Sequence, residues 1–376
     1  MNRRLVIVVP DARFFVTHRM ALALAAKARG YDVHVATNAG AEVPQIIAAG
    51  LAWHRVRGGP LRQKPWNDLL TLLDLLALYR RLKPSLVHHV TLKPAVYGTL
   101  AARINRIPAV VNTIPGLGEV FVAHTPGDRF WRAIVLALFR TVVRHRRMKV
   151  IVQNADDLRT LLGTGAVKEE QTALIWGSGV DPDLWRLPPP PVRVPAVTCA
   201  SRIVETKGIG EFAAAARLLR SRGVEARFLL AGDRDTGNSK AYSDATFGTL
   251  LAGGAVEYLG WRASMLDLYA ETDIVCLPSW GGEGVPKALI EASSCELPVV
   301  TTDVPGCRDL VRHGESGFVV PPRTVEPLAD ALQALIEDAE LRRRMGKRGR
   351  EIVVERFSLQ TVLDATLAVY DELLSA

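Results

Sequence analysis

Short apolar runs alternate with longer amphipathic segments along most of the chain. Residues 6–9 form the first run, and residues 18–29 follow with a helical periodicity that stops at Gly30. A continuous apolar run indicates a strand covered on both faces, as in a parallel sheet between layers of helices. The same pattern predicts a helix at 69–82 and further strands at 32–36, 86–90, 109–112, 150–152 and 173–175. The first half is therefore expected to be an α/β domain.

A run of prolines interrupts this alternation at residues 188–195. Consecutive prolines fit neither a helix nor a central strand, so we expect an extended linker there. The alternation then restarts, with a helix expected at 210–222 and strands at 197–200, 226–230, 274–277 and 298–301.

This organisation predicts two Rossmann-like domains with parallel sheets. We place them at residues 1–187 and 196–356, and expect a C-terminal helix at 357–376 to pack back on the first domain. Ligands of such sheets lie beyond the carboxyl ends of the strands, so the two domains are expected to face each other across an interdomain cleft.

The composition limits the classes of partner. A length of 376 residues suits two domains, and the net charge of +8 agrees either with plain solubility or with an anionic partner such as a nucleotide, a lipid diphosphate or a membrane surface. No recognised nucleic-acid-binding motif accompanies the charge, so nucleic acid is not an expected partner. No apolar run is long enough to predict a transmembrane helix, and residues 1–10 are interpreted as a first strand rather than a signal peptide.

The four cysteines form no Cys-x-x-Cys pair, and the histidines show no metal-binding spacing. Cys199 and Cys276 lie in predicted strands, which favours buried free thiols and a reducing, cytoplasmic location. No metal site is predicted.

The turn after the first predicted strand argues against a dinucleotide-binding enzyme. A Gly-x-Gly-x-x-Gly turn would let the backbone approach a pyrophosphate, but residues 10–19 contain no glycine. An NAD-dependent reaction is therefore not expected.

Basic side chains follow the first predicted strand of the second domain. Arg202 and Lys207 lie between this strand and the next predicted helix, where a guanidinium and an ammonium would suit a diphosphate. Solvated loop residues are the alternative. Gly232 and Asp233 end the following strand, either as an ordinary turn or as a close approach of the backbone to a ligand.

Residues 278–292 run from a strand end through a glycine turn into a helix. Pro286 suits the first helical turn, and the free amides near Gly284 and Val285 would form an anion site. Glu283 and Glu291 could flank a ligand lying across the helix start, as acceptors for sugar hydroxyls. Complementing the helix dipole is an alternative role for Glu283 alone.

Glu283 and Glu291, with seven residues between them, resemble the paired-glutamate motif of the retaining family 4 (group 1) glycosyltransferases. Arg202 and Lys207 match the basic pair of that family. Other segments follow the family pattern in order, namely residues 232–233, 259–261, 273–279 and 314–322.

The resemblance implies a GT-B fold and a nucleoside-diphosphate sugar, expected to be a UDP-sugar, as donor. It implies that Arg202 and Lys207 hold the diphosphate, that Glu291 holds the ribose and that Glu283 contacts the donor sugar. Arg202, Lys207 and Glu283 are thus the expected catalytic residues. The other expected donor-binding residues are Gly232, Asp233, Gly284, Val285 and Pro286.

The family normally requires no cofactor or divalent metal, because the basic pair and the helix amides neutralise the leaving diphosphate. Asp233 and Asp235 have the spacing of a metal-binding Asp-x-Asp motif, but their position at the Gly232 turn favours the donor loop.

The acceptor is expected in the first domain. Residues 284–287, 304–308, 88–98 and 112–118 resemble the branch that builds bacterial capsule, O-antigen and glycan repeat units. That branch implies a glycan on an undecaprenyl diphosphate. The acceptor-side candidates are His18, His88, His89, Lys93, Asn112 and Thr113.

One departure from the family pattern concerns its histidine. Many members carry a functional histidine after the strand that corresponds to 109–111, where this chain has Asn112 and Thr113. His88 and His89 lie one strand earlier, and each is either an acceptor-side residue or a satisfied core histidine. We assign no catalytic base, since retention by front-face substitution needs no protein nucleophile.

Residues 130–149 combine apolar and aromatic side chains with a basic cluster. They are interpreted either as an interfacial helix that brings the enzyme to the inner face of the plasma membrane, or as a core helix with a cationic end. Two other functions remain as alternatives, a nucleotide-sugar epimerase with the GT-B fold and a non-catalytic carbohydrate-binding protein. The glutamate pair with Arg202 and Lys207 argues against both.

Overall fold

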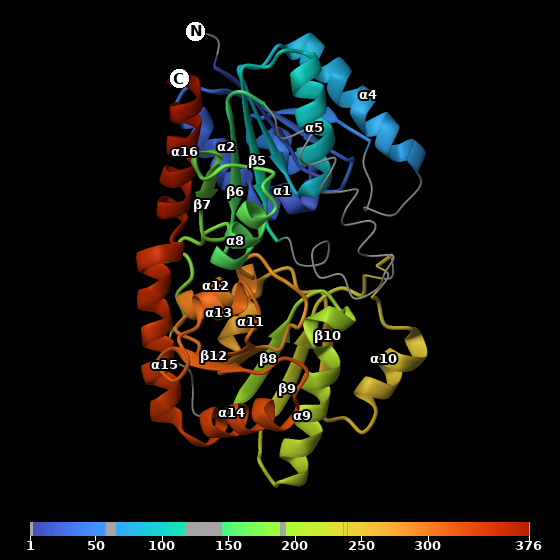
Figure 1. The fold of residues 1–376 in the computed structure, drawn as a ribbon. Helices are drawn as coiled ribbons and strands as arrows, with labels where there is room; N and C mark the ends of the chain where they lie inside the picture. Colours follow the sequence, from blue (N-terminus) through green and yellow to red (C-terminus); the bar gives the residue numbers. More distant parts are fainter. Residues whose placement is uncertain are drawn as a thin grey trace. The chain divides into compact units, whose positions relative to one another are not determined.

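The computed structural model describes residues 3–57, 65–116, 145–188 and 193–375, apart from Thr236 and Ser239. Within these ranges the N-terminal half forms one parallel sheet in the order β3-β2-β1-β4-β5-β6-β7 (Figure 1). Its strands are β1 (Arg4–Val8), β2 (Asp32–Thr37), β3 (Ala52–Arg55), β4 (Leu86–Val90), β5 (Ala109–Ile114), β6 (Met148–Val152) and β7 (Thr172–Leu174).

The two faces of this sheet bury different sets of side chains. In β1, Leu5 and Ile7 enter one hydrophobic cluster, whereas Val6 and Val8 enter the other. Successive side chains of a strand point to opposite faces, so a strand buried on both faces reads as one continuous apolar run. Helices therefore cover both faces of the sheet.

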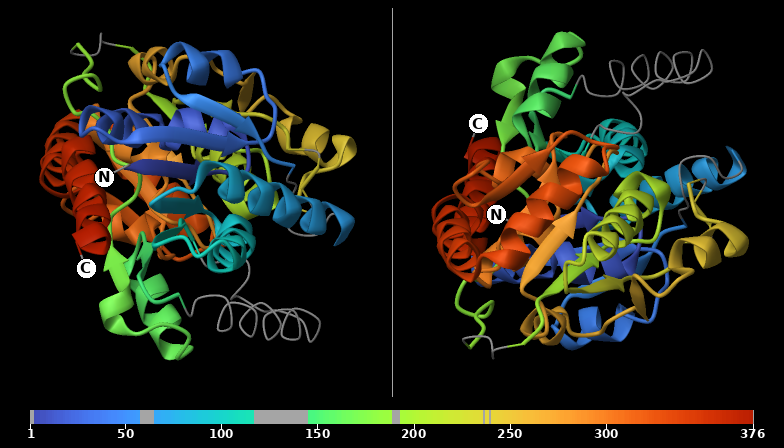
Figure 2. Two further views of the ribbon diagram at one scale, coloured as in Figure 1. Left: turned by 90° about the horizontal axis from the view of Figure 1, so that it is seen from above. Right: turned by 90° about the horizontal axis from the view of Figure 1, so that it is seen from below.

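The helices of the first unit divide between these clusters (Figure 2). One face carries α4 (Pro65–Leu82), α5 (Leu92–Ile104) and α8 (Ala155–Gly163), and the other carries α1 (Ala12–His18), α2 (Met20–Ala28), α3 (Val43–Ala48) and α16 (Leu359–Ser375).

The second parallel sheet has the order β10-β9-β8-β11-β12-β13. Its strands are β8 (Ala196–Ala200), β9 (Arg227–Ala231), β10 (Glu257–Gly260), β11 (Ile274–Leu277), β12 (Val299–Thr302) and β13 (Gly317–Val320). Its helices are α9 (Ile209–Ser221), α10 (Asp244–Leu251), α11 (Met265–Ala270), α12 (Lys287–Ser294), α13 (Cys307–Leu310), α14 (Glu326–Glu337) and α15 (Ala339–Ile352).

Both sheets contain a topological switch point. The order reverses direction between β1 and β4 in the first sheet and between β8 and β11 in the second. The loops that leave two such strands diverge to opposite sides, which opens a crevice at their carboxyl ends. A ligand site of the second unit is therefore expected at the loops after β8 and β11.

Contacts divide the chain into two compact units, Met1–Ser178 with Thr361–Ala376, and Gly179–Gln360. The C-terminal helix α16 belongs to the first unit, where Tyr370 and Leu373 enter the core. Residues 179–187 belong to the second unit, because Val180 pairs with Ser358 and the Trp185 ring lies 5.9 Å from that of Tyr269. The boundary between the units, after Ser178, thus lies before the proline run at 188–195, where the sequence pattern restarts.

The four cysteines are free and buried. Burial raises the pKa of Cys199 to about 12, so its thiol stays protonated at neutral pH. Of the residues predicted as an interfacial helix, 130–144 lie outside the described ranges, and Met148 and Lys149 belong to strand β6. None of the helices in the described ranges has the length and apolarity needed to cross a membrane.

Candidate active site

The loops after β8 and β11 are tied together through their backbones. The carbonyl oxygen of Thr206 accepts hydrogen bonds from the amides of Trp280 at 2.9 Å and Gly281 at 3.1 Å. Gly208 has a left-handed φ of 72°, and a Cβ there would overlap the carbonyl oxygen of Pro278. Only a glycine permits this approach, so the turn that carries Lys207 rests directly on the loop that carries Glu283.

This contact brings Lys207 and Glu283 together. The Lys207 ammonium donates to Glu283 Oε1, and the Ser279 hydroxyl donates to the same oxygen at 2.7 Å. The side chains of Lys207 and Glu283 are only 13% and 16% exposed, so solvent screens their attraction weakly. The result is a fixed cation beside a fixed carboxylate at the switch point.

The glycine turn after β11 leads into α12. Pro286 occupies the N-cap position, one residue before the helix. Gly306 in the next loop has a φ of 82°, and a Cβ there would overlap the carbonyl oxygen of Gly284. The amides of Gly284 and Val285 bond to no described residue, which leaves donors at a helix start for an anionic group.

Glu291 lies one turn inside α12 and is 6% exposed. Burial raises the pKa of this carboxyl group to about 7, although the Lys287 ammonium, 3.4 Å away, opposes the shift. Hydroxyl groups that donate hydrogen bonds to this buried carboxylate would therefore stabilise its charge more than they would stabilise an exposed one.

Arg202 lies on the same edge of the sheet but has a different partner. Its guanidinium bonds Asp235 at 3.2 Å and is 60% exposed. Gly232 has a φ of 147° that would place a Cβ onto the carbonyl oxygen of Ser201. The loops after β8 and β9 are therefore in contact, and the carbonyl of Asp233 accepts from the Ile203 amide at 2.9 Å.

Asp235, the second carboxylate of the Asp-x-Asp spacing, is thus engaged by a cation. Within the described ranges no group of three or more His, Cys, Asp or Glu side chains is arranged to hold a metal ion.

Four of the acceptor-side candidates of the first unit are buried and hydrogen-bonded to neighbouring core residues. His88 bonds the hydroxyls of Tyr370 at 2.5 Å and Thr113 at 2.7 Å, and His89 bonds Asn112 at 2.8 Å and the Tyr79 hydroxyl at 2.8 Å. His88, His89, Asn112 and Thr113 are all at most 2% exposed. His88 and His89 are therefore satisfied core histidines, the second of the two alternatives.

Burial also keeps both imidazoles neutral. It lowers the pKa of His88 well below the ordinary value, and the nearby Arg19 guanidinium adds to the shift. It lowers the pKa of His89 to about 4. Asn112 and Thr113 both belong to strand β5, whereas the family pattern places the corresponding histidine in the loop after the strand.

Two other candidates lie nearer the surface. His18 ends α1 and its Nδ1 lies 3.2 Å from the Ser178 hydroxyl. Lys93 in α5 pairs with Asp68 at 2.6 Å. Close by, Thr91 at the end of β4 has a φ of 76°, an unusual conformation for a β-branched residue.

His88→Ala is expected to lower the free energy of unfolding by about 2–4 kcal/mol, because it leaves a cavity and two unpaired hydroxyls. Turnover per folded molecule should stay within about a factor of two, because a loss of stability does not change the activity of the molecules that remain folded. Denaturant titration and kinetics on the same preparation separate the two quantities. Normal stability with lost turnover would restore His88 as an acceptor-side residue.

Sequence reasoning missed several residues of the site. Ser279 joins the two loops, because its hydroxyl lies 3.0 Å from the Thr206 carbonyl oxygen as well as bonding Glu283. Lys287 pairs with Glu291, and the spacing of four residues along a helix could have revealed it. The pairing of Arg202 with Asp235 joins residues distant in sequence, and no spacing pattern could have revealed it.

Comparisons with known proteins show the family of the chain. A family described as "Glycosyl transferase 4-like" matches residues 5–154, and one described as "Glycosyl transferases group 1" matches residues 194–338. Together the two matches span most of both units, and the second includes Arg202, Lys207, Glu283 and Glu291.

Two relatives extend over most of the chain. The capsular polysaccharide biosynthesis glycosyltransferase CapM of Staphylococcus aureus is 27% identical, over 92% of this chain and 91% of its own length. The N,N'-diacetylbacillosaminyl-diphospho-undecaprenol alpha-1,3-N-acetylgalactosaminyltransferase of Campylobacter jejuni is 25% identical, over 82% of this chain and 83% of its own.

Solved structures share the fold. The crystal structure of Anabaena HepE in complex with UDP and glucose superposes with a TM-score of 0.80 at 19% identity, and it covers 98% of this chain and 100% of its own. At this identity the likeness concerns the fold alone.

Proposed function

The chain belongs to the group 1 glycosyltransferases, and we propose that it transfers a hexose or N-acetylhexosamine from a UDP-sugar, with retention, to a lipid-diphosphate-linked glycan of bacterial surface polysaccharide. Its two parallel sheets, in the orders given above, form a GT-B fold. The donor is assigned to the second unit and the acceptor to the first.

The cluster of Lys207, Glu283 and Ser279 beside the amides of Gly284 and Val285 carries the proposal. A cation and free amides suit the leaving diphosphate, and the adjacent carboxylate suits the hydroxyls of the donor sugar. Arg202 is proposed to contact the diphosphate from the neighbouring loop, and Glu291 the ribose. Gly232, Asp233 and Pro286 would border the donor.

In the proposed reaction the bond between the anomeric carbon and the β-phosphate oxygen breaks, and its electron pair stays on that oxygen. The acceptor hydroxyl forms the new bond on the same face of the sugar, and its proton passes to the departing phosphate. Lys207 and the helix amides act on negative charge that grows as this bond breaks, so they lower the barrier rather than only the binding energy.

The relatives support the finer parts of this proposal. The Campylobacter relative is named for a diphospho-undecaprenol acceptor and the Staphylococcus relative for capsular polysaccharide biosynthesis. Anabaena HepE was crystallised with UDP and glucose. These names favour UDP as the nucleotide and a polyprenyl diphosphate as the acceptor anchor.

A screen of nucleotide sugars against lipid-diphosphate acceptors tests the proposal. We expect UDP release that depends on acceptor, and a product heavier by one hexose or N-acetylhexosamine with unchanged anomeric configuration. Transfer only from a different nucleotide, or an inverted product, would refute the corresponding part.

Transfer is expected to survive EDTA, because Lys207 and the helix amides supply the positive charge that a divalent ion would supply elsewhere. The rate should change by less than about twofold, since the protein's own donors neutralise the leaving group. The comparison uses enzyme dialysed against chelator and re-supplied with Mg²⁺ or Mn²⁺. Loss of activity that only metal restores would contradict this account of the leaving group.

Peripheral attachment to the cytoplasmic leaflet is part of the proposal, motivated by the lipid-linked acceptor and by the exposed Arg146 and Arg147. The double variant Arg146→Glu/Arg147→Glu should lose most of its sedimentation with anionic vesicles at low salt, because each basic residue contributes about 1 kcal/mol near the surface. Transfer to a soluble acceptor should be retained. Equal binding of both proteins, or no preference for anionic over neutral vesicles, would rule this surface out.

A further inference from the structure

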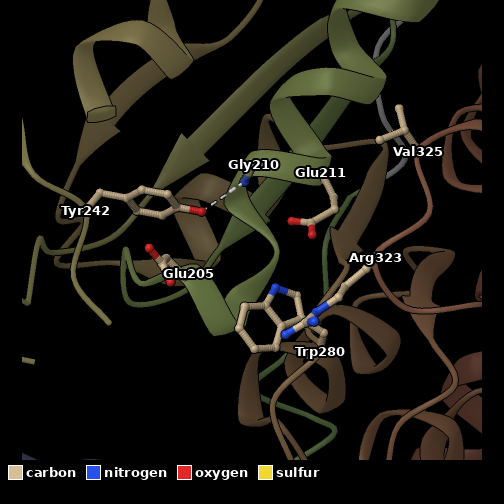
Figure 3. A pocket seen from close by; sticks show the side chains of 7 residues that line it. All are labelled: Glu205, Gly210, Glu211, Tyr242, Trp280, Arg323 and Val325. Atoms are coloured by element: carbon tan, nitrogen blue, oxygen red, sulfur yellow. Dashed lines mark hydrogen bonds between the residues drawn. The ribbon is translucent and has the colours of Figure 1, made fainter. Parts of the chain in front are cut away.

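A pocket of about 400 Å³ opens at the first turn of α9, within the second unit (Figure 3). Glu205 and Glu211 lie on either side of the start of α9, and three loops distant in sequence contribute Tyr242, Trp280 and Arg323. The donor assignment above uses none of them. Glu205 nevertheless shares the short η2 helix (Glu205–Lys207) with Lys207, so the pocket adjoins the donor loop.

One wall of the pocket is a stacked pair. The Arg323 guanidinium lies 3.9 Å from the centre of the Trp280 ring, as Figure 3 shows. Arg323 has a φ of 60°, a left-handed conformation that few residues other than glycine adopt. The loop after β13 thus accepts an unfavourable backbone conformation at the residue that places this cation over the ring.

The polar groups that line the pocket have unused hydrogen-bond donors and acceptors. The carboxylates of Glu205 and Glu211 form no hydrogen bond or ion pair with any residue in the described ranges, and the same holds for the Arg323 guanidinium apart from its stacking. Tyr242 accepts a bond from the Gly210 amide at 3.2 Å. Burial raises the pKa of Tyr242 to about 12, so the phenol keeps a proton to donate.

This set of groups selects among ligand classes. The pocket carries both signs of charge: a simple cation would meet the Arg323 guanidinium, which already covers the Trp280 ring, and a simple anion would meet two carboxylates. An apolar ligand would leave charged groups unpaired. Hydroxyl groups both donate to carboxylates and accept from a guanidinium or phenol. We propose that the pocket binds a neutral saccharide, separately from the donor sugar.

Ligand-detected NMR with UDP at saturating concentration tests this without turnover. Neutral mono- and oligosaccharides should give saturation transfer while UDP occupies the donor site. Glu211→Ala and Arg323→Ala should each weaken saccharide binding about tenfold, equivalent to roughly 1.4 kcal/mol. Glu225→Ala removes an exposed carboxylate beyond the other end of α9 and should change nothing.

Several results would overturn the proposal. They are the absence of any saccharide signal beside UDP, equal affinity in all four proteins, or binding of a zwitterionic amino acid in place of saccharides. Thermal unfolding of each variant shows that a loss is not a loss of fold. If UDP itself fails to bind, the proposed donor is wrong, and the effect of the Glu211 and Arg323 substitutions on saccharide binding still decides the pocket.

Discussion

Lys207→Ala is expected to lower kcat by about 10²–10³-fold, the effect typical of removing one fixed donor from a site where negative charge develops. Lys207 is partly buried and held between Glu283 and the tied loops, so no solvent cation can take its place in the same geometry. The loss should exceed the rise in KM, because the leaving phosphate carries its greatest charge in the transition state. Steady-state kinetics with acceptor at saturation measures both.

The comparison with Arg202→Ala makes this prediction sharper. Arg202 is 60% exposed and already bonds Asp235, so its removal should cost about tenfold. Lys168→Ala, an exposed lysine of the first unit, is the matched control and should behave as wild type. If Lys207→Ala stays folded and retains more than about a third of the wild-type kcat, the cluster does not stabilise the leaving group.

The central strands were predictable because both of their faces are buried. Continuous or largely apolar runs identified β1, β4, β8 and β11, and these strands flank the two switch points. The edge strands β3 and β10 were not predicted. Their side chains are only partly buried, and their sequences, Ala-Trp-His-Arg and Glu-Tyr-Leu-Gly, contain no apolar run. The turn expected at 10–19 is largely helix α1, which Asp11 caps by accepting from the Phe14 amide.

The donor side could be located from sequence because strand order fixes it. The crevice at the switch point is bordered by the segments that follow β8 and β11, and the basic pair and the paired glutamates lie in those segments. The direct pairing of Lys207 with Glu283 depends on the close approach at Gly208, which sequence does not reveal. The interdomain cleft stays a prediction.

The acceptor side shows the opposite case. Polar residues such as Asn112 and His89 suggest a binding site in sequence, yet here each bonds the other inside the core. A polar side chain is tolerated there only when a partner is present, and the partner lies one strand away. Pattern alone could not distinguish such a pair from a binding site.

Glu291→Gln is expected to stabilise the second unit at alkaline pH and to weaken the binding of the donor nucleotide. In the folded state the carboxyl has a pKa of about 7, above its ordinary value of 4.5, so folding favours the protonated form. The group's contribution to stability is therefore complete below pH 4.5 and is lost as pH rises through 7. Ionising it above that range costs on the order of 3 kcal/mol.

The glutamine variant should match wild type near pH 4.5 and exceed it at pH 8, because a neutral amide never has to ionise in the buried site. Denaturant titrations of both proteins across this range measure the difference. UDP should bind the variant about tenfold more weakly, since hydrogen bonds from the ribose to a charged acceptor are stronger than those to an amide. Glu296→Gln, an exposed carboxylate, should alter neither quantity. Parallel pH profiles for Glu291→Gln and wild type would mean that Glu291 ionises normally, whereas unchanged UDP affinity would remove it from the proposed ribose contact. The two outcomes are independent, so the experiment separates the cost of burying this carboxylate from the use the enzyme makes of it.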